Sequence, residues 1–122
     1  MTVIVTDTGF GTAHWPKDGV DIASDTTPAR LAGVLAAPAI RIDFPAFADG
    51  RGFTLARRLR LLGFAGRLRA AGHLLPDQYA MARRSGFDEV EISDDIAARQ
   101  PESHWLRRAD WRAHDYQSRL RA

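Results

Sequence analysis

Two short glycine-containing segments of this 122-residue chain carry polar side chains at spacings that suit chemistry. The first reads D-G-R-G-F-T at residues 49–54. Gly50 and Gly52 let the backbone turn tightly and approach a ligand closely. Thr54 can cap a helix whose free N–H groups favour an anion, and Arg51 adds a two-pronged donor for phosphate, sulfate or carboxylate. This segment therefore predicts an anion site.

A structural turn explains the same residues equally well. In that alternative, Arg51 pairs with Asp49, Asp43 or Asp77 and holds no ligand. The segment lacks the lysine and the glycine spacing of a Walker phosphate loop, so the residue types leave both interpretations open. Arg69 lies in a predicted strand, where it either joins the anion site from an edge or is buried against an acidic partner.

The second segment, Gly72-His73, ends a predicted strand, which is a usual place for a general acid or base. Asp77, four residues later, could orient the imidazole. Alternatively, Asp77 and Gln78 cap the following helix and His73 is a loop histidine without a chemical role. His73, Asp77 and Asp49 are therefore the catalytic candidates, and whether the chain is an enzyme stays open.

The elements that must position both segments lie between Ile40 and Ile92. Three apolar runs alternate there with helix-like segments, and Gly, Pro or Asp stands at almost every junction. We expect strands at residues 40–44, 67–71 and 87–92, and helices at residues 54–62 and 76–85. This alternation is typical of a βαβαβ core with a parallel sheet.

Loops that follow parallel strands all emerge at one edge of the sheet, the carboxyl edge, and ligands commonly bind there. In this chain those loops are residues 45–53, 72–76 and 93–95, the last of which supplies carboxylates. We therefore expect the D-G-R-G segment and Gly72-His73 to open onto a common rim.

The rest of the chain predicts one further strand and two further helices. Residues 2–6 alternate β-branched side chains, and Thr27-Pro28 is a strong start for a helix that reaches Leu35. Apolar side chains recur at three- and four-residue spacings in residues 101–121, which predicts an amphipathic helix that lies across the domain or against a second copy in a homodimer. The predicted fold is a single α/β domain over residues 1–122, with a small parallel sheet of about four strands flanked by helices.

Composition excludes several kinds of chemistry. The chain has no cysteine, which removes disulfides, iron–sulfur clusters, zinc ribbons and thiol catalysis. Its histidines, at positions 14, 73, 104 and 114, form no metal-ligand spacing. We therefore expect no metal, and a redox role would need a borrowed organic cofactor or a partner's redox centre. No signal peptide or bilayer-spanning run is visible, so we expect a cytoplasmic protein without membrane association.

Positive charge is concentrated in the middle of the chain. The formal net charge is only +2, but residues 41–86 contain nine arginines and three aspartates, a local excess of +6. Such a region attracts phosphate, nucleotide or an acidic protein, unless its arginines are simply solvated helix surfaces. No nucleic-acid-binding motif is present, so we expect no nucleic-acid partner.

Several motifs occur in a fixed order in the central and C-terminal parts of the chain. They are F-P-A-F-A-D-G-R-G-F-T-L-A-R-R-L-R at 44–60, G-R-L-R-A-A-G at 66–72, D-Q at 77–78, R-S-G-F-D at 84–88 and Y-Q at 116–117. Together they resemble a bacterial family known as domain of unknown function 934. Two positions depart from the family pattern: His73, where an acidic residue is common, and Ser85, where many relatives carry Cys.

The resemblance implies a role in sulfur assimilation. Genes of the family commonly lie beside the gene for the assimilatory sulfite reductase haemoprotein, and its members are often labelled oxidoreductases of sulfite reduction. One expectation is an accessory protein that binds the haemoprotein or its acidic electron donor through the basic region. The alternative is a small anion- or nucleotide-binding enzyme, an oxidoreductase, whose carboxyl-edge site uses Gly50, Arg51, Gly52, Thr54 and Arg69.

Overall fold

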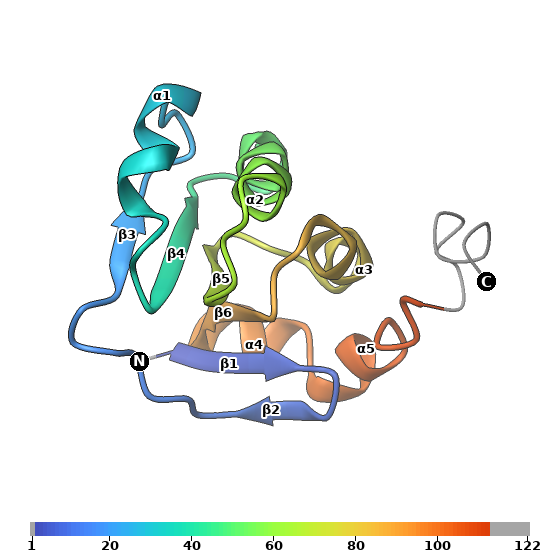
Figure 1. Ribbon diagram of the computed structural model, residues 1–122. Coiled ribbons are helices and arrows are strands. Elements are labelled where there is room, and N and C mark those ends of the chain that lie inside the picture. The colour runs from blue at the N-terminus through green and yellow to red at the C-terminus, as the bar shows by residue number, and fades with distance from the viewer. Residues whose placement is uncertain (1, 113–122) are drawn as a thin grey trace.

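The computed structural model describes residues 2–112, and this part of the chain is organised around one β-sheet (Figure 1). The sheet has six strands, which lie side by side in the order β2-β1-β6-β5-β4-β3. The strands are β1 (Thr2–Thr6), β2 (Gly9–Gly11), β3 (Val20–Ile22), β4 (Ala39–Phe44), β5 (Arg67–Gly72) and β6 (Glu89–Ser93).

The sheet is mixed rather than purely parallel. β3, β4, β5 and β6 are parallel and are neighbours in chain order. β1 runs antiparallel to β6, and a hairpin adds β2 antiparallel to β1. The α/β class and the parallel order of the three central strands are therefore confirmed, but the predicted sheet of about four parallel strands is corrected to six strands in mixed directions.

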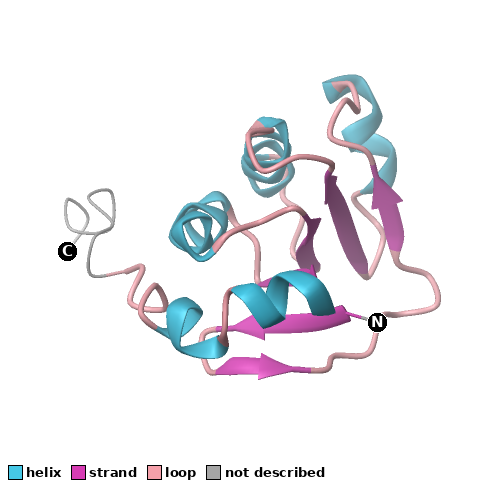
Figure 2. Ribbon diagram, turned by 180° about the vertical axis from the view of Figure 1, so that it is seen from behind, coloured by secondary structure: helices cyan, strands magenta, loops and turns pink. Residues whose placement is uncertain are grey.

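The helices between the parallel strands cover a single face of the sheet. They are α1 (Pro28–Leu31), which continues as the 3₁₀ helix η1 (Ala32–Val34), α2 (Arg51–Leu61) and α3 (Pro76–Ser85). Connections between adjacent parallel strands are right-handed, so strands in consecutive order place all their helices on the same side. Figures 1 and 2 show α1, α2 and α3 along that side from opposite directions. Two short helices, α4 (Asp94–Arg99) and α5 (Glu102–Leu106), follow β6.

Capping residues and glycines set the ends of the two long helices, α2 and α3. α3 occupies the predicted residues 76–85, and Gly86 and Gly63 end α3 and α2 in the left-handed conformation. α2 begins three residues earlier than expected, because Gly50 rather than Thr54 is the N-cap. The carboxylate of Asp49 accepts a hydrogen bond from the backbone N–H of Arg51 at 3.0 Å, which satisfies one of the free donors of the first turn.

The alternation of side chains along the strands separates an apolar face from a charged face. In β4, Ile40, Ile42 and Phe44 are fully buried in the core beneath the helices. Arg41 and Asp43 alternate with them and therefore lie on the opposite face. The same alternation in β5 and β6 puts arginines and glutamates on that opposite face, which we call the charged face.

Two regions differ from the elements expected from the sequence. No strand was expected in residues 18–26, yet they contain β3, a three-residue strand that pairs with β4 at the edge of the sheet. The helix expected over residues 101–121 is shorter in its described part, because α5 ends at Leu106 and turns follow. Residues 113–121 lie outside the described part of the chain, and so does any homodimer contact through them.

A polar cluster around Asp7 ties the hairpin tip to α3 and to the segment after α5. The Asp7 carboxylate accepts hydrogen bonds from the Tyr79 hydroxyl, from Arg83 at 3.2 Å and from the Trp111 indole at 3.2 Å. Burial alone would raise the pKa of Asp7, but these hydrogen bonds outweigh it and hold the pKa below its ordinary value of 3.8.

The Asp7 cluster predicts a specific acid sensitivity. The unfolded chain takes up the Asp7 proton first as the pH falls, because the folded-state pKa is the lower one. The stabilisation by Asp7 is therefore complete above about pH 5 and is lost as the pH drops through 3.8 towards the folded pKa. Urea denaturation between pH 3 and 7 should show a shallower acid-side slope for Asp7→Asn than for wild type. Asp18→Asn, an exposed aspartate outside the cluster, is the control, and equal slopes in all three proteins would contradict the prediction.

Candidate functional site

A hollow of about 480 Å³ lies at the carboxyl edge of the parallel strands, on the charged face of the sheet. Its wall includes residues from β1, β3, β4, β5, β6 and α4. The polar lining residues are Thr2, Asp21, Arg41, Asp43, His73, Glu91 and Ser93, and the others are Ile22, Ala71, Gly72, Ile92 and Ile96. Residues far apart in sequence therefore converge at the edge where the sequence predicted a site.

His73 reaches this hollow through the end of β5. Gly72 has a φ of +122°, and a Cβ at this position would lie 2.6 Å from the carbonyl oxygen of Phe44, so a side chain here would be strained. The turn lets the His73 backbone N–H donate to the same oxygen at 2.9 Å. The imidazole Nδ1 lies 3.3 Å from that oxygen and acts as its donor, and the ring packs edge-on against Phe47. Nε2 is then the free acceptor of the imidazole.

Asp77 has a different neighbour from the one expected for an orienting carboxylate. Its carboxylate lies 2.6 Å from the guanidinium of Arg108, beyond α5, and is largely exposed. Gln78 caps α3, since its side-chain oxygen accepts from the backbone N–H of Leu75 at 2.8 Å. The structure therefore shows Asp77 and Gln78 in the alternative arrangement at the start of α3, with the backbone of Phe44 rather than Asp77 holding His73.

Arg51 pairs with Asp49, which was the first of the structural alternatives. Two guanidinium nitrogens contact the Asp49 carboxylate at 2.7 and 3.0 Å, and Ser24 contacts both side chains. The hydrogen bonds from Arg51 hold the pKa of Asp49 far below its ordinary range. Asp49 thus occupies the place at the α2 N-terminus where the sequence predicted an external anion, and any such anion would compete with it.

Arg69 is separated from the other residues of the predicted anion site, which lie at the start of α2. Gly52 lies in α2 under the Phe44 ring, where an added Cβ would come within 2.5 Å of a ring carbon. Thr54 is exposed in the second turn of α2. Together with Arg51, it lines a shallow depression next to α1. Arg69 lies on the charged face of the sheet, across from α2. Gly50, Arg51, Gly52 and Thr54 therefore stay together in one helix start, and Arg69 belongs to a separate group.

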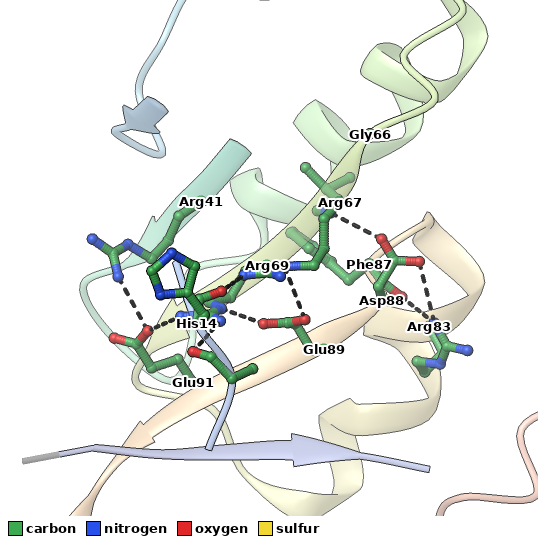
Figure 3. Close-up of polar contacts among 12 residues, drawn as sticks. His14, Arg41, Gly66, Arg67, Arg69, Arg83, Phe87, Asp88, Glu89 and Glu91 are labelled. Atoms are coloured by element: carbon green, nitrogen blue, oxygen red, sulfur yellow. Dashed lines mark hydrogen bonds and ion pairs between the residues drawn. The ribbon is translucent and has the colours of Figure 1, made fainter. Parts of the chain in front are cut away.

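Arg69 is the centre of an ion-pair network on the charged face (Figure 3). Its side chain is 3% exposed and bonds to Glu89 and, at 2.7 Å, to Glu91. Glu91 also accepts from Arg41 at 3.1 Å, and Arg67 lies 3.3 Å from Glu89. A buried arginine needs such partners, and the structure supplies them from the neighbouring strand.

Trp15 covers this network from the loop between β2 and β3. Its ring lies 4.7 Å from the guanidinium carbon of Arg69, 4.9 Å from that of Arg41 and 5.4 Å from that of Arg67. Arg67 and Arg69 also donate to the backbone carbonyls of residues 13 and 14, which holds the loop on the sheet. The loop thus shields the network from water and strengthens its ion pairs.

Sequence reasoning overlooked the acidic and basic strand residues that line the hollow. Asp21, Arg41 and Glu91 had no assigned role, and Asp43 was considered only as a partner for Arg51. The signal was present in the alternating runs I-R-I-D-F at 40–44 and E-V-E-I at 89–92, in which every second residue is charged. Such alternation indicates a strand with one polar face.

A second candidate surface lies on the outer side of α2 and α3. Six of the nine arginines in residues 41–86 pair with carboxylates, namely Arg41, Arg51, Arg60, Arg67, Arg69 and Arg83. Within residues 2–112, Arg57, Arg58 and Arg84 have no such partner. Of the predicted basic region, only these three arginines therefore carry a charge that no carboxylate in residues 2–112 neutralises.

Exposed apolar side chains accompany two of these arginines. Leu61 is 86% exposed and Leu62 is 50% exposed, one turn beyond Arg57 and Arg58 in α2. Met81 of α3 is 44% exposed and receives a 3.5 Å contact from Arg57. We call these five residues the α2 surface: it combines two unpaired cations with exposed apolar side chains and contains no acidic residue.

Comparison with known proteins identifies a family. The model of the family described as bacterial protein of unknown function (DUF934) matches residues 19–122. No curated protein and no solved structure matches the chain. In residues 2–112, no group of His, Asp and Glu side chains is arranged to hold a metal ion, and no helix is long and apolar enough to cross a bilayer.

Proposed function

The chain belongs to the DUF934 family of bacterial proteins, and from this premise we propose that it is an accessory protein of assimilatory sulfite reduction. In this role it binds an acidic protein partner, either the sulfite reductase haemoprotein or the protein that donates electrons to it. The observation that supports this proposal is the α2 surface, in which Arg57 and Arg58 have no carboxylate partner in the described part of the chain and lie beside the exposed Leu61.

The composition of the α2 surface suits a protein rather than a small ligand. Protein interfaces are enriched in arginine, methionine and aromatic side chains and have a polar rim, and apolar side chains that are exposed next to one another can mark such a contact. Leu61 projects too far into solvent to contribute to the core of this domain. Positive charge around it would steer an acidic partner and raise its association rate.

Charge reversal tests the docking role directly. Arg57→Glu/Arg58→Glu should weaken binding to the purified haemoprotein, or to its purified electron donor, by about tenfold or more at low salt. Binding kinetics at about 50 mM and about 300 mM salt would show that the loss is mainly in the association rate. Lys17→Glu/Arg107→Glu reverses two exposed charges outside the surface and should bind like wild type. Absence of wild-type binding to both partners at low salt would refute the proposal.

Growth tests the process independently of the docking surface. A strain lacking this protein should grow on sulfide but fail on sulfate and sulfite, because the block would lie at sulfite reduction. Complementation with Lys17→Glu/Arg107→Glu should restore growth, whereas Arg57→Glu/Arg58→Glu should not. Normal growth of the deletion strain on all three sulfur sources would remove the assignment to this process.

A further inference from the structure

The hollow at the carboxyl edge has the size and lining of a small-molecule site. Its volume of about 480 Å³ lies within the usual range for such sites, roughly 300–1,000 Å³. Ala71 and Ile96, both partly exposed, are the apolar side chains of its wall, and convergent polar groups lie beside them on β4, β5 and β6. The hollow is also separate from the α2 surface, because it opens on the other face of the sheet.

The charge of the hollow follows from the ion-pair network at its base. Three guanidinium groups, those of Arg41, Arg67 and Arg69, face three carboxylates, those of Asp21, Glu89 and Glu91. These charges cancel. Asp43 stands outside the network: it is exposed, it lines the hollow, and its carboxylate has no hydrogen bond or ion pair with any residue in 2–112. Among the described residues of the hollow and its base, the uncompensated charge is therefore a single negative one.

Arg41 is the one arginine or lysine among the described residues of the wall, and its guanidinium nitrogens are already engaged. Its Nε and Nη2 atoms donate to the two carboxylate oxygens of Asp21 at 2.6 and 3.1 Å, and Nη1 donates to Glu91 at 3.1 Å. The hydrogen bonds to Asp21 raise its pKa, so this arginine stays charged and internally paired. An anion entering the hollow would find these nitrogens engaged and would face the carboxylate of Asp43.

We propose that this hollow binds a small organic monocation, with an ammonium or amidinium group on Asp43 and an apolar body against Ala71 and Ile96. The free Nε2 of His73 is a second hydrogen-bond acceptor at the same rim. This assignment differs from the anion or nucleotide expected from the sequence, since the arginines on which that expectation rested are paired with acidic residues. It does not depend on the accessory role or on the α2 surface.

Three small molecules of nearly equal shape test the charge preference. Benzamidine is a cation, benzamide is neutral and benzoate is an anion, and each would fit the hollow. Titrations of the full chain by two-dimensional NMR should show saturable shifts of the Gly72 and His73 amides with benzamidine. Its Kd should be lower than that of benzamide by about tenfold or more, and benzoate should give no saturable shift. Equal binding of all three, tighter binding of benzoate, or no binding of benzamidine would overturn the proposal.

Asp43→Asn separates the role of the carboxylate from that of the cavity. Because Asp43 is exposed and unpaired, the variant should fold with an unchanged Tm, yet it should bind benzamidine no better than benzamide. Asp110→Asn removes an exposed carboxylate outside the hollow and should keep the full preference. Retention of the preference in Asp43→Asn would contradict the assigned contact. Arg57→Glu/Arg58→Glu should bind benzamidine normally, so failure of the docking proposal and failure of this one are distinguishable.

Discussion

Replacement of Arg69 by Met is expected to lower the free energy of unfolding by about 3–5 kcal/mol. Most of this cost comes from the Glu89 carboxylate that stays buried without its main partner, and less of it from the lost hydrogen bond itself. The Glu89 side chain is only 7% exposed, and without Arg69 its remaining cationic neighbour is Arg67 at 3.3 Å. A carboxylate in that position would be charged, poorly hydrated and insufficiently paired.

The loss of stability is increased by the other contacts of Arg69. Arg69 joins two glutamates of β6 and lies under the Trp15 ring, so its removal leaves Glu91 with Arg41 alone and takes one of the three cations from the indole. The carbonyl of residue 13 also loses its donor, which weakens the attachment of the covering loop. Water would then reach the charged face more easily, and the remaining ion pairs would become weaker.

Urea denaturation would measure how much the free energy of unfolding falls in Arg69→Met. Two further variants show which interaction is responsible for the change. Arg99→Met removes an exposed arginine that pairs with Asp95 within one turn of α4, so it should cost about 0.5 kcal/mol or less. Arg69→Met/Glu89→Met removes both buried charges and should recover most of the stability, because replacing a buried pair by apolar side chains is often neutral. A cost below about 1 kcal/mol for Arg69→Met, or no recovery in the double variant, would contradict this account.

Local sequence signals were sufficient for the helices and for the direction of the central strands. The bounds of α3 follow from Pro76 at its start and Gly86 after its end, and both act through the backbone of their own residues. Likewise, the strand–helix–strand order of β4, α2 and β5 requires a parallel pair, because the helix carries the chain back to the same end of the sheet.

The short edge strands β2 and β3, and the pairing partner of β1, could not be predicted in the same way. β2 and β3 are three residues long, which is too short for a periodic pattern to distinguish a strand from a turn. The pairing of β1 with β6 joins residues about 90 positions apart, such as Thr2 and Ser93. No local rule specifies that choice, since it depends on which sheet edge remains open after the parallel strands have formed.

For the candidate site, likewise, the sequence predicted the location but not the partners of its charged residues. The D-G-R-G segment and Gly72-His73 were predicted to share one rim. Gly72 and His73 do line the hollow with Asp43 and Glu91 from neighbouring strands, but Arg51 and Thr54 line a separate depression beside α1. Which partner each charged residue takes was not predictable. Arg51, at the start of α2, bonds to a residue two positions away, whereas Arg69, inside β5, bonds to residues twenty or more positions away.

Phe44→Ala is expected to destabilise the fold by about 3–5 kcal/mol, the usual cost of emptying a buried phenylalanine site. Phe44 is fully buried, with its ring centroid 5.0 Å from that of Phe53 and 5.8 Å from that of Phe87. Its ring also occupies the space above Gly52, so this glycine in the D-G-R-G segment is explained by packing against β4. The surrounding strands and α2 cannot collapse into the cavity without moving the helix start.

Phe47→Ala is the matched comparison, because it makes the same chemical change three residues later. Phe47 is 40% exposed and its ring packs edge-on against His73, so its loss should cost less than about 1 kcal/mol. Thermal and urea unfolding followed by circular dichroism would give both values, and Phe44→Leu should fall between them. Similar costs for Phe44→Ala and Phe47→Ala would mean that the Phe44 ring does not hold α2 on the sheet. In that case the position of the α2 surface would need a different structural explanation.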